Sequence, residues 1–183
     1  HHDQLKIAAA HQRWLERHPG ALPGNGVIVA HPDTGYTDHP ELEGRWRKPG
    51  RSFLVDGNDA LDDLMPGRFS APGHGTATAS VIASGSSESD GTWVEVSGIA
   101  PGVQVVPLRV SQSVIHIDFE NLSRAIAHAT TIDADVISMS LGGPFKDEFL
   151  RTCIAEAHAR GIIVVSAAGN MVPTVVYPAA FPE

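Results

Sequence analysis

The chain has 183 residues, of which 42% are hydrophobic, and this is enough for one domain with a real core. Its net charge of −8 at neutral pH argues against a nucleic-acid or anionic-membrane partner, because neither would attract it. The single Cys153 excludes an internal disulfide, and no run approaches the ~20 apolar residues that span a bilayer. The composition therefore indicates a globular domain with no membrane partner.

The first half of the chain alternates between helical and extended patterns. Apolar residues between positions 5 and 15 recur at helical spacing, and residues 27–30 form a continuously apolar run typical of a parallel strand. The polar stretch 45–69 is rich in Gly, Pro and Asp, which predicts a loop with a brief strand at 52–55. Residues 76–84 follow as a predicted helix of small, uncharged side chains that suits a buried position.

The second half continues this alternation. Strands are predicted at residues 103–110, 136–140 and 162–165, and a helix that begins after Asp118 separates the first two. Another helix, closed by Gly161 as its C-cap, precedes the last strand. The side chains predicted to form its buried face are Phe149, Leu150, Cys153, Ile154 and Ala157. Such alternation predicts an α/β fold, a doubly wound and mostly parallel sheet with helices on both faces.

Polar or small residues follow three of the predicted strands. Asp33 follows the first strand, Ser140 begins a turn after a middle strand, and Asn170 follows the last one. In a doubly wound sheet, function gathers beyond the carboxyl ends of the strands. We therefore expect these three residues to lie at one edge of the sheet.

His74 is the candidate general base. Gly73 and Gly75 flank it, so the backbone can turn sharply and approach other groups closely. It stands at the first turn of the helix predicted at 76–84, where the helix dipole disfavours a cation and helps to keep the imidazole neutral. The alternative is a helix-capping or hydrogen-bonded core histidine. The sequence Gly-His-Gly-Thr, followed by a helix of small residues, favours the base.

Asp33 opens the turn Asp33-Thr34-Gly35 and permits three interpretations. As a turn residue it would cap backbone amides while Gly35 adopts a positive φ. As the acid of a catalytic triad it would accept the Nδ1 proton of His74 and stabilise the imidazolium. Asp-Thr-Gly also opens the active site of aspartic proteases, but that chemistry needs two such carboxylates in a β-rich fold. The sequence has no second Asp-Thr-Gly or Asp-Ser-Gly.

Two further segments are candidates for binding a substrate. Asn170 ends an Ala-Ala-Gly-Asn sequence and is either a loop asparagine with left-handed backbone or the donor of its side-chain NH₂ to an oxyanion. The small residues before it leave room for a substrate side chain. Ser140, Leu141, Gly142 and Gly143 form either a strand end and a turn, or an open edge on which a peptide lies as an extra strand.

Several segments, in this order along the chain, resemble the subtilisin-like serine proteases (subtilases), whose triad runs Asp, His, Ser. They are Asp33-Thr34-Gly35 with His39-Pro40-Glu41-Leu42, Gly73-His74-Gly75-Thr76, Gly98-Ile99-Ala100-Pro101, Ser138-Met139-Ser140-Leu141-Gly142-Gly143, and Ala167-Ala168-Gly169-Asn170 with Tyr177-Pro178-Ala179. From about Leu5 to Glu183 the chain looks like the N-terminal part of a subtilase catalytic domain. We therefore expect one peptidase-like domain over residues 1–183.

This resemblance implies a role for each matched position. Asp33 resembles the triad acid, His74 the general base, and Asn170 the oxyanion donor. The implied function is a serine endopeptidase that acts on peptides or proteins, without a cofactor or a catalytic metal, and the resemblance favours an extracellular location. The positions that match substrate-binding segments are Ser140, Leu141, Gly142, Gly143, Ala168 and Gly169.

Two segments depart from the family pattern. His31 and Pro32 stand where the family usually has aliphatic residues, and Pro32 removes one donor from the strand ladder beside the acid. The segment 84–96 carries Glu88, Asp90 and Glu95 but lacks the asparagine pattern of the family's calcium loop. That composition favours a solvated loop over a calcium site.

The serine that serves as nucleophile in this family is not found after Asn170. The chain is therefore expected to lack the serine-bearing segment and to be inactive alone. Its last strand and covering helix are then expected to expose apolar surface, through which it self-associates or pairs with the missing half. A domain that only binds extended peptides is the main alternative. A nucleotide-binding domain is disfavoured, because no Gly-x-Gly-x-x-Gly follows a strand and no Gly-Lys-Ser/Thr occurs.

Overall fold

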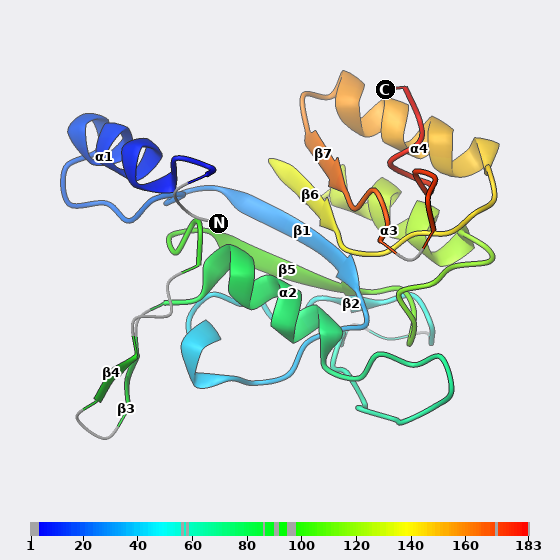
Figure 1. Cartoon of the computed structure of the whole chain (residues 1–183), viewed down its shortest axis with the longest axis horizontal. Coiled ribbons are helices and arrows are strands. Elements are labelled where there is room, and N and C mark those ends of the chain that lie inside the picture. The colour runs from blue at the N-terminus through cyan, green and yellow to red at the C-terminus, as the bar shows by residue number, and fades with distance from the viewer. Residues whose placement is uncertain are drawn as a thin grey trace.

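Five parallel strands form the sheet at the centre of the molecule (Figure 1). The computed structural model describes residues 4–55, 57, 59–85, 87–89, 92–94, 98–170 and 172–182. The parallel pairing confirms the predicted class of sheet. In spatial order the strands are β2 (Arg51–Ser52), β5 (Gln104–Arg109), β1 (Ile28–Asp33), β6 (Val136–Met139) and β7 (Ile163–Ser166).

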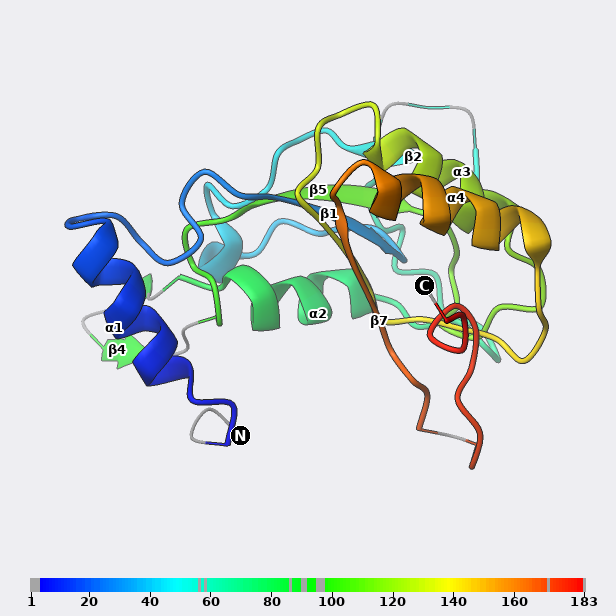
Figure 2. The ribbon, with the colours of Figure 1, turned by 90° about the horizontal axis from the view of Figure 1, so that it is seen from above.

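Helices cover both faces of this sheet (Figure 2). Helix α2 (His74–Ala83) lies on one face, and α3 (Glu120–Ala129) and α4 (Glu148–Ala159) pack together on the other. Helix α1 (Ile7–Arg17) lies beyond one end of the sheet and buries none of its residues, and the 3₁₀ helix η1 (Pro40–Leu42) contacts α2. Within the part of the chain that the structure describes, no helix is long and apolar enough to cross a membrane.

The two helical layers create two apolar cores. Successive strand residues point to opposite faces, so the central strands contribute to both cores. Ala30, Val106 and Leu108 pack in the core beneath α3 and α4, whereas Val29 and Val105 pack in the core beneath α2. The continuously apolar pattern of these strands therefore corresponds to burial on both faces.

Strand β1 extends further than the apolar run that predicted it. It continues through His31 and Pro32 to Asp33, which lies opposite Arg109 of β5. Pro32 has no N–H for the ladder, yet it stays in register opposite Leu108, so the parallel pairing is kept up to the acid. This extension places Asp33 at the carboxyl end of the central strand.

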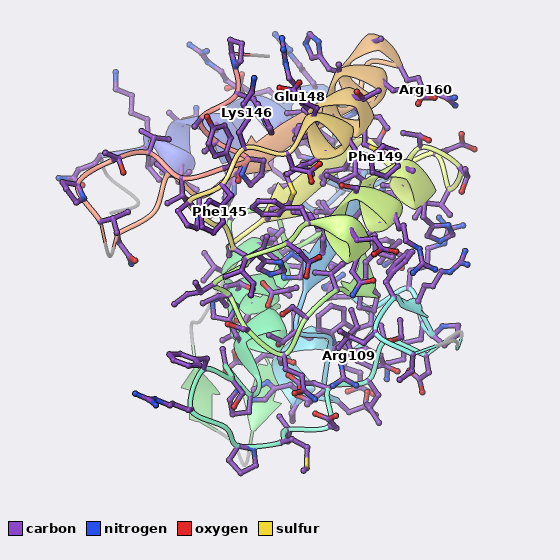
Figure 3. All side chains as sticks on the ribbon, turned by 90° about the vertical axis from the view of Figure 1, so that its right-hand side faces the viewer. Arg109, Phe145, Lys146, Glu148, Phe149 and Arg160 are labelled. Atoms are coloured by element: carbon purple, nitrogen blue, oxygen red, sulfur yellow. The ribbon has the colours of Figure 1, made fainter. Side chains whose placement is uncertain are left out.

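One residue predicted in the buried face of α4 is exposed. Phe149 is 59% exposed and lies at the start of α4, at the opposite end from Arg160 (Figure 3). Successive helical residues are about 100° apart, so the residue before the first member of an apolar stripe points away from the core. The buried side chains of α4 are Leu150, Cys153, Ile154 and Ala157.

Strand β7 is the edge of the sheet and exposes apolar surface. Ile163 is 61% exposed and Val165 is 51% exposed. This confirms the expected exposure on the last strand. The predicted brief strand at 52–55 is shorter than expected, because β2 ends at Ser52 and a turn follows.

The segment expected to be a solvated loop contains a small hairpin. The backbone of β3 (Ser87–Ser89) pairs antiparallel with that of β4 (Thr92–Val94). Asp90, Glu95 and the side chain of Glu88, on which the calcium alternative depended, lie outside the described part of the chain.

Candidate active site

Asp33 and His74 meet at the carboxyl end of β1. The Nδ1–H of His74 donates to Oδ1 of Asp33 at 2.8 Å, and the backbone N–H of Thr34 donates to the same oxygen at 2.7 Å. The side chain of Asp33 is 1% exposed, whereas that of His74 is 29% exposed. With Nδ1 as the donor, Nε2 of the neutral ring is free to accept a proton. The contact expected from the sequence is therefore present.

Asp33 and His74 each shift the pKa of the other. The hydrogen bond to Asp33 raises the pKa of His74 above its ordinary value and outweighs the opposing effect of partial burial. Burial alone would raise the pKa of Asp33, but the hydrogen bond from His74 and the neighbouring His31 hold that pKa below its ordinary range. The expectation that the start of α2 keeps His74 neutral is wrong in direction, because the hydrogen bond to Asp33 stabilises the protonated ring and raises its pKa.

Replacing His74 by alanine is expected to remove a pH-dependent part of the folding stability. The folded-state pKa of His74 lies above its ordinary value of 6.5, so its protonated form stabilises the fold below that pH. This contribution is lost as the pH rises through the folded-state pKa. The difference in unfolding free energy between the parent chain and His74→Ala should therefore be larger at about pH 5 than at about pH 9, measured by urea denaturation.

His128→Ala is the matched control for this measurement. Burial, with Arg51 nearby, lowers the pKa of His128, so its contribution is lost as the pH falls. The two variants should therefore show opposite pH trends. Equal differences at both pH values for His74→Ala would contradict the ion pair with Asp33.

A buried carboxylate, that of Asp62, connects the two turns of the site. Its Oδ2 accepts from the Thr34 hydroxyl at 2.9 Å and from the Gly73 N–H at 2.8 Å. The Thr34 Oγ1 in turn accepts from the Gly75 N–H at 3.1 Å. These bonds join the turn after β1 to the start of α2, so they fix the separation of Asp33 and His74.

His74 opens onto a cleft of about 640 Å³ between the ends of β6 and β7. Asn170 lines the same cleft. Ser140, Leu141, Gly142, Gly143, Ala168 and Gly169 also line it. The apolar side chains that complete the wall, which the sequence did not single out, are Val114, Ile115, Val172 and Val176.

A sequence model of the Subtilase family matches residues 24–183, which is most of the chain. The chain belongs to the subtilase family. Similar proteins of known sequence include Subtilisin E from Bacillus subtilis (strain 168), which is 32% identical over 98% of this chain and 43% of its own length. Subtilisin from Bacillus pumilus is also 32% identical, over 98% of this chain and 60% of its own length. The chain thus spans about half the length of these relatives.

A similar solved structure extends this relationship to the fold. A protease from Pseudoalteromonas arctica PAMC 21717 superposes with a TM-score of 0.66 at 28% identity. The superposition covers 82% of this chain and 51% of that protease. The sheet and helices described above are therefore those of a subtilase over the matched part.

The two glycines of the 140–143 segment, Gly142 and Gly143, are paired with other segments of the chain. Gly142 donates its N–H to the carbonyl of Val114, and its own carbonyl accepts from the N–H of His116. Gly143 exchanges both backbone hydrogen bonds with Tyr177. Of the two interpretations of the 140–143 segment, the open edge therefore does not hold at Gly142 and Gly143, because neighbouring segments of the chain pair with their backbone groups.

Ser166 is the one serine in the sequence after the 140–143 segment. Its Oγ is buried and has no hydrogen-bond partner among the residues that the structure describes. It lies on β7 beside a separate hollow of about 320 Å³, which Ile154 and Phe181 also line. Ser166 therefore faces into the sheet packing and not onto the cleft that holds His74.

Among the described residues, no three or more His, Cys, Asp or Glu side chains lie close enough together to hold a metal ion. The titratable side chains of the site have partners within the chain. His74 pairs with Asp33, and Asp62 accepts from loop donors. The arrangement of this part of the subtilase suits acid–base chemistry by protein side chains.

Proposed function

We propose that this protein is a serine endopeptidase of the subtilisin type in which Asp33 is the acid and His74 the general base. The observation that carries this proposal is the 2.8 Å hydrogen bond between the buried Asp33 carboxylate and Nδ1 of His74 at the mouth of the cleft. It leaves Nε2 of His74 directed toward a bound substrate while Asp33 stabilises the imidazolium. Family membership supports the same chemistry.

The reaction would proceed by acyl transfer. A serine hydroxyl attacks the scissile carbonyl carbon while Nε2 of His74 takes its proton, and the carbonyl oxygen becomes an oxyanion to which the Asn170 amide donates. His74 then gives that proton to the departing amine as the C–N bond breaks. Water repeats the sequence on the acyl-enzyme and releases the carboxylate product. No cofactor enters this scheme.

We further propose that the serine is supplied from outside residues 1–183. Ser166 has a buried hydroxyl on a strand, and no other serine follows the 140–143 segment. The isolated 183-residue chain would then bind a peptide but leave it uncut. The apolar lining of the cleft, which includes Ile115 and Val176, favours peptides with apolar side chains at the positions that enter it.

The experiment that tests this function begins with the reading frame after codon 183. The protein expressed through the first downstream Gly-Thr-Ser segment should react covalently with a fluorophosphonate probe, and its His74→Ala variant should not. The endopeptidase proposal would be overturned by a reading frame that ends without a Gly-Thr-Ser segment. It would also be overturned if the His74→Ala variant were labelled as strongly as the parent protein. The first of these outcomes would leave the peptide-binding domain as the function.

The exposed edge of β7 suggests where a partner would dock. We propose that Ile163 and Val165 are covered either by the serine-bearing segment or by a second copy of the chain. Sedimentation of the 183-residue chain as a monomer at high concentration would exclude the second copy. An extracellular location is proposed on family membership alone.

A further inference from the structure

His31 is a second histidine at the Asp33 carboxylate, on the side away from His74. The two residues stand two positions apart on β1, so their side chains point to the same face of the sheet, toward α2. His31 is 1% exposed, and its Nε2 lies 3.8 Å from Oδ2 of Asp33. The function described above makes no use of this buried ring.

Both nitrogens of His31 have partners on neighbouring elements. Nδ1 lies 3.1 Å from the carbonyl oxygen of Ser138 on β6. Nε2 lies 3.0 Å from Oγ1 of Thr78 and 3.2 Å from the carbonyl oxygen of Gly75, both on α2. The ring therefore bridges β6 and α2 across the end of β1.

Thr78 connects this ring to the acid. It lies one helical turn after His74 on α2, on the same face of the helix. Its one hydroxyl hydrogen has three acceptors within reach: Oδ2 of Asp33 at 3.2 Å, and the carbonyl oxygens of His74 at 3.0 Å and Gly75 at 3.3 Å. A hydrogen bond from Nε2–H of His31 to the Thr78 oxygen, at 3.0 Å, leaves that hydrogen to be donated to Asp33. Oδ1 of Asp33 is held by His74 and Thr34, so both carboxylate oxygens have fixed partners.

We propose that His31 is a positioning residue that acts through Thr78 to hold the Asp33 carboxylate in the orientation that fixes the Nδ1–H tautomer of His74. The inference rests on the proposed function, because it assigns the second oxygen of the proposed acid. A histidine that merely filled the core would need only carbonyl partners, as His116 has with Ser113. His31 has carbonyl partners too, but its Nε2 also reaches the hydroxyl of Thr78, which itself contacts Asp33.

The other charged groups near this network are occupied elsewhere. The Asp62 carboxylate accepts from Thr34 and Gly73, and Arg109 on β5 pairs with Asp63 at 2.8 Å. In Figure 3, Arg109 lies well apart from Phe149 and Arg160 at the two ends of α4. His31 and Thr78 are thus the side chains that engage Oδ2 among the described residues.

The experiment measures the tautomer of His74 directly. The 183-residue chain is labelled with ¹⁵N-histidine, and the ring nitrogen shifts are recorded by long-range ¹H–¹⁵N NMR at a pH where His74 is neutral. His74→Gln identifies the signals of His74 by their loss. In the parent chain the Nδ1–H form should dominate. In His31→Val and in Thr78→Val the ratio of the Nδ1–H to the Nε2–H form should fall by about tenfold, since Asp33 loses an aligned partner.

Two control variants separate positioning from packing. Thr78→Ser keeps the hydroxyl and should retain the parent ratio. His116→Gln removes another buried histidine and should lower stability without changing the His74 tautomer. An unchanged ratio in a folded Thr78→Val chain would overturn the proposal, even where His31→Val fails to fold. Because no turnover is measured, this outcome is distinct from failure of fluorophosphonate labelling, which would overturn the endopeptidase function.

Discussion

The 183-residue chain on its own is expected to leave an unstructured peptide substrate uncut. The proposed base, His74, and the proposed acid, Asp33, are in contact, but the sole serine after the 140–143 segment has a buried hydroxyl on β7. In subtilisin, a relative of this chain, loss of the nucleophile alone lowers kcat by roughly a millionfold, about as much as loss of the whole triad. We therefore expect no hydrolysis above background in a fluorogenic peptide assay and no labelling by a fluorophosphonate probe.

Addition of the serine-bearing segment in trans should restore turnover if the two pieces dock. The same segment added to His74→Ala should restore none, because the proton of the serine would have no acceptor. Weak peptide binding should survive in the 183-residue chain, since the cleft is formed by residues it contains. Hydrolysis by the purified 183-residue chain that depends on His74 would show that its nucleophile has been misassigned.

Gly75→Ala is expected to cause a large loss of stability. A Cβ atom at Gly75 would overlap the carbonyl oxygen of Gly35 and lie 3.2 Å from Cβ of Asp33. Gly35 belongs to the turn after β1 and Asp33 is the last residue of that strand, so neither can yield without moving the Asp33 carboxylate. We expect a loss of about 3 kcal/mol or more in the free energy of unfolding, measured by urea denaturation. The pKa of His74 should fall toward 6.5 as its contact with Asp33 is broken.

Gly57→Ala is the matched control. The same added atom at Gly57 meets nothing within 4 Å, so the unfolding free energy should change by no more than about 0.5 kcal/mol. A Gly75→Ala chain as stable as this control, with the pKa of His74 still raised, would show that α2 can move away from β1 without cost.

The sequence predicted those parts of the site that depend on local pattern. Asp33, His74 and Asn170 each follow or begin an element with a clear apolar signature, and parallel strands place such positions at one edge of a sheet. Phe149 was predicted in the core and is exposed, because the beginning of a helical stripe is hard to fix from spacing alone. Gly142 was left between a turn and an open edge, and the structure pairs it with another segment of the chain.

The polar network around the acid could not have been predicted in the same way. Asp62 lies in a stretch where aspartate is common, and nothing in its spacing marks it as the carboxylate that joins two turns. The spacing of His31 from Asp33, and of Thr78 from His74, does predict shared faces. Which faces meet depends on the register of β1 against β6 and α2, and that register is set by packing between distant parts of the chain.

The central position of β1 in the sheet also determines at what stage of synthesis Asp33 can be fixed in its folded position. Asp33 emerges from the ribosome early in synthesis, but the two strands that flank β1 begin only at Gln104 and Val136. Until both have emerged, a nascent chain would present an apolar strand with two unpaired edges, which other chains can pair with. Most of the chain must therefore be synthesised before the acid is fixed, and the distant pairing slows folding. Asp33 is thus synthesised early but fixed in position only after most of the chain has been made.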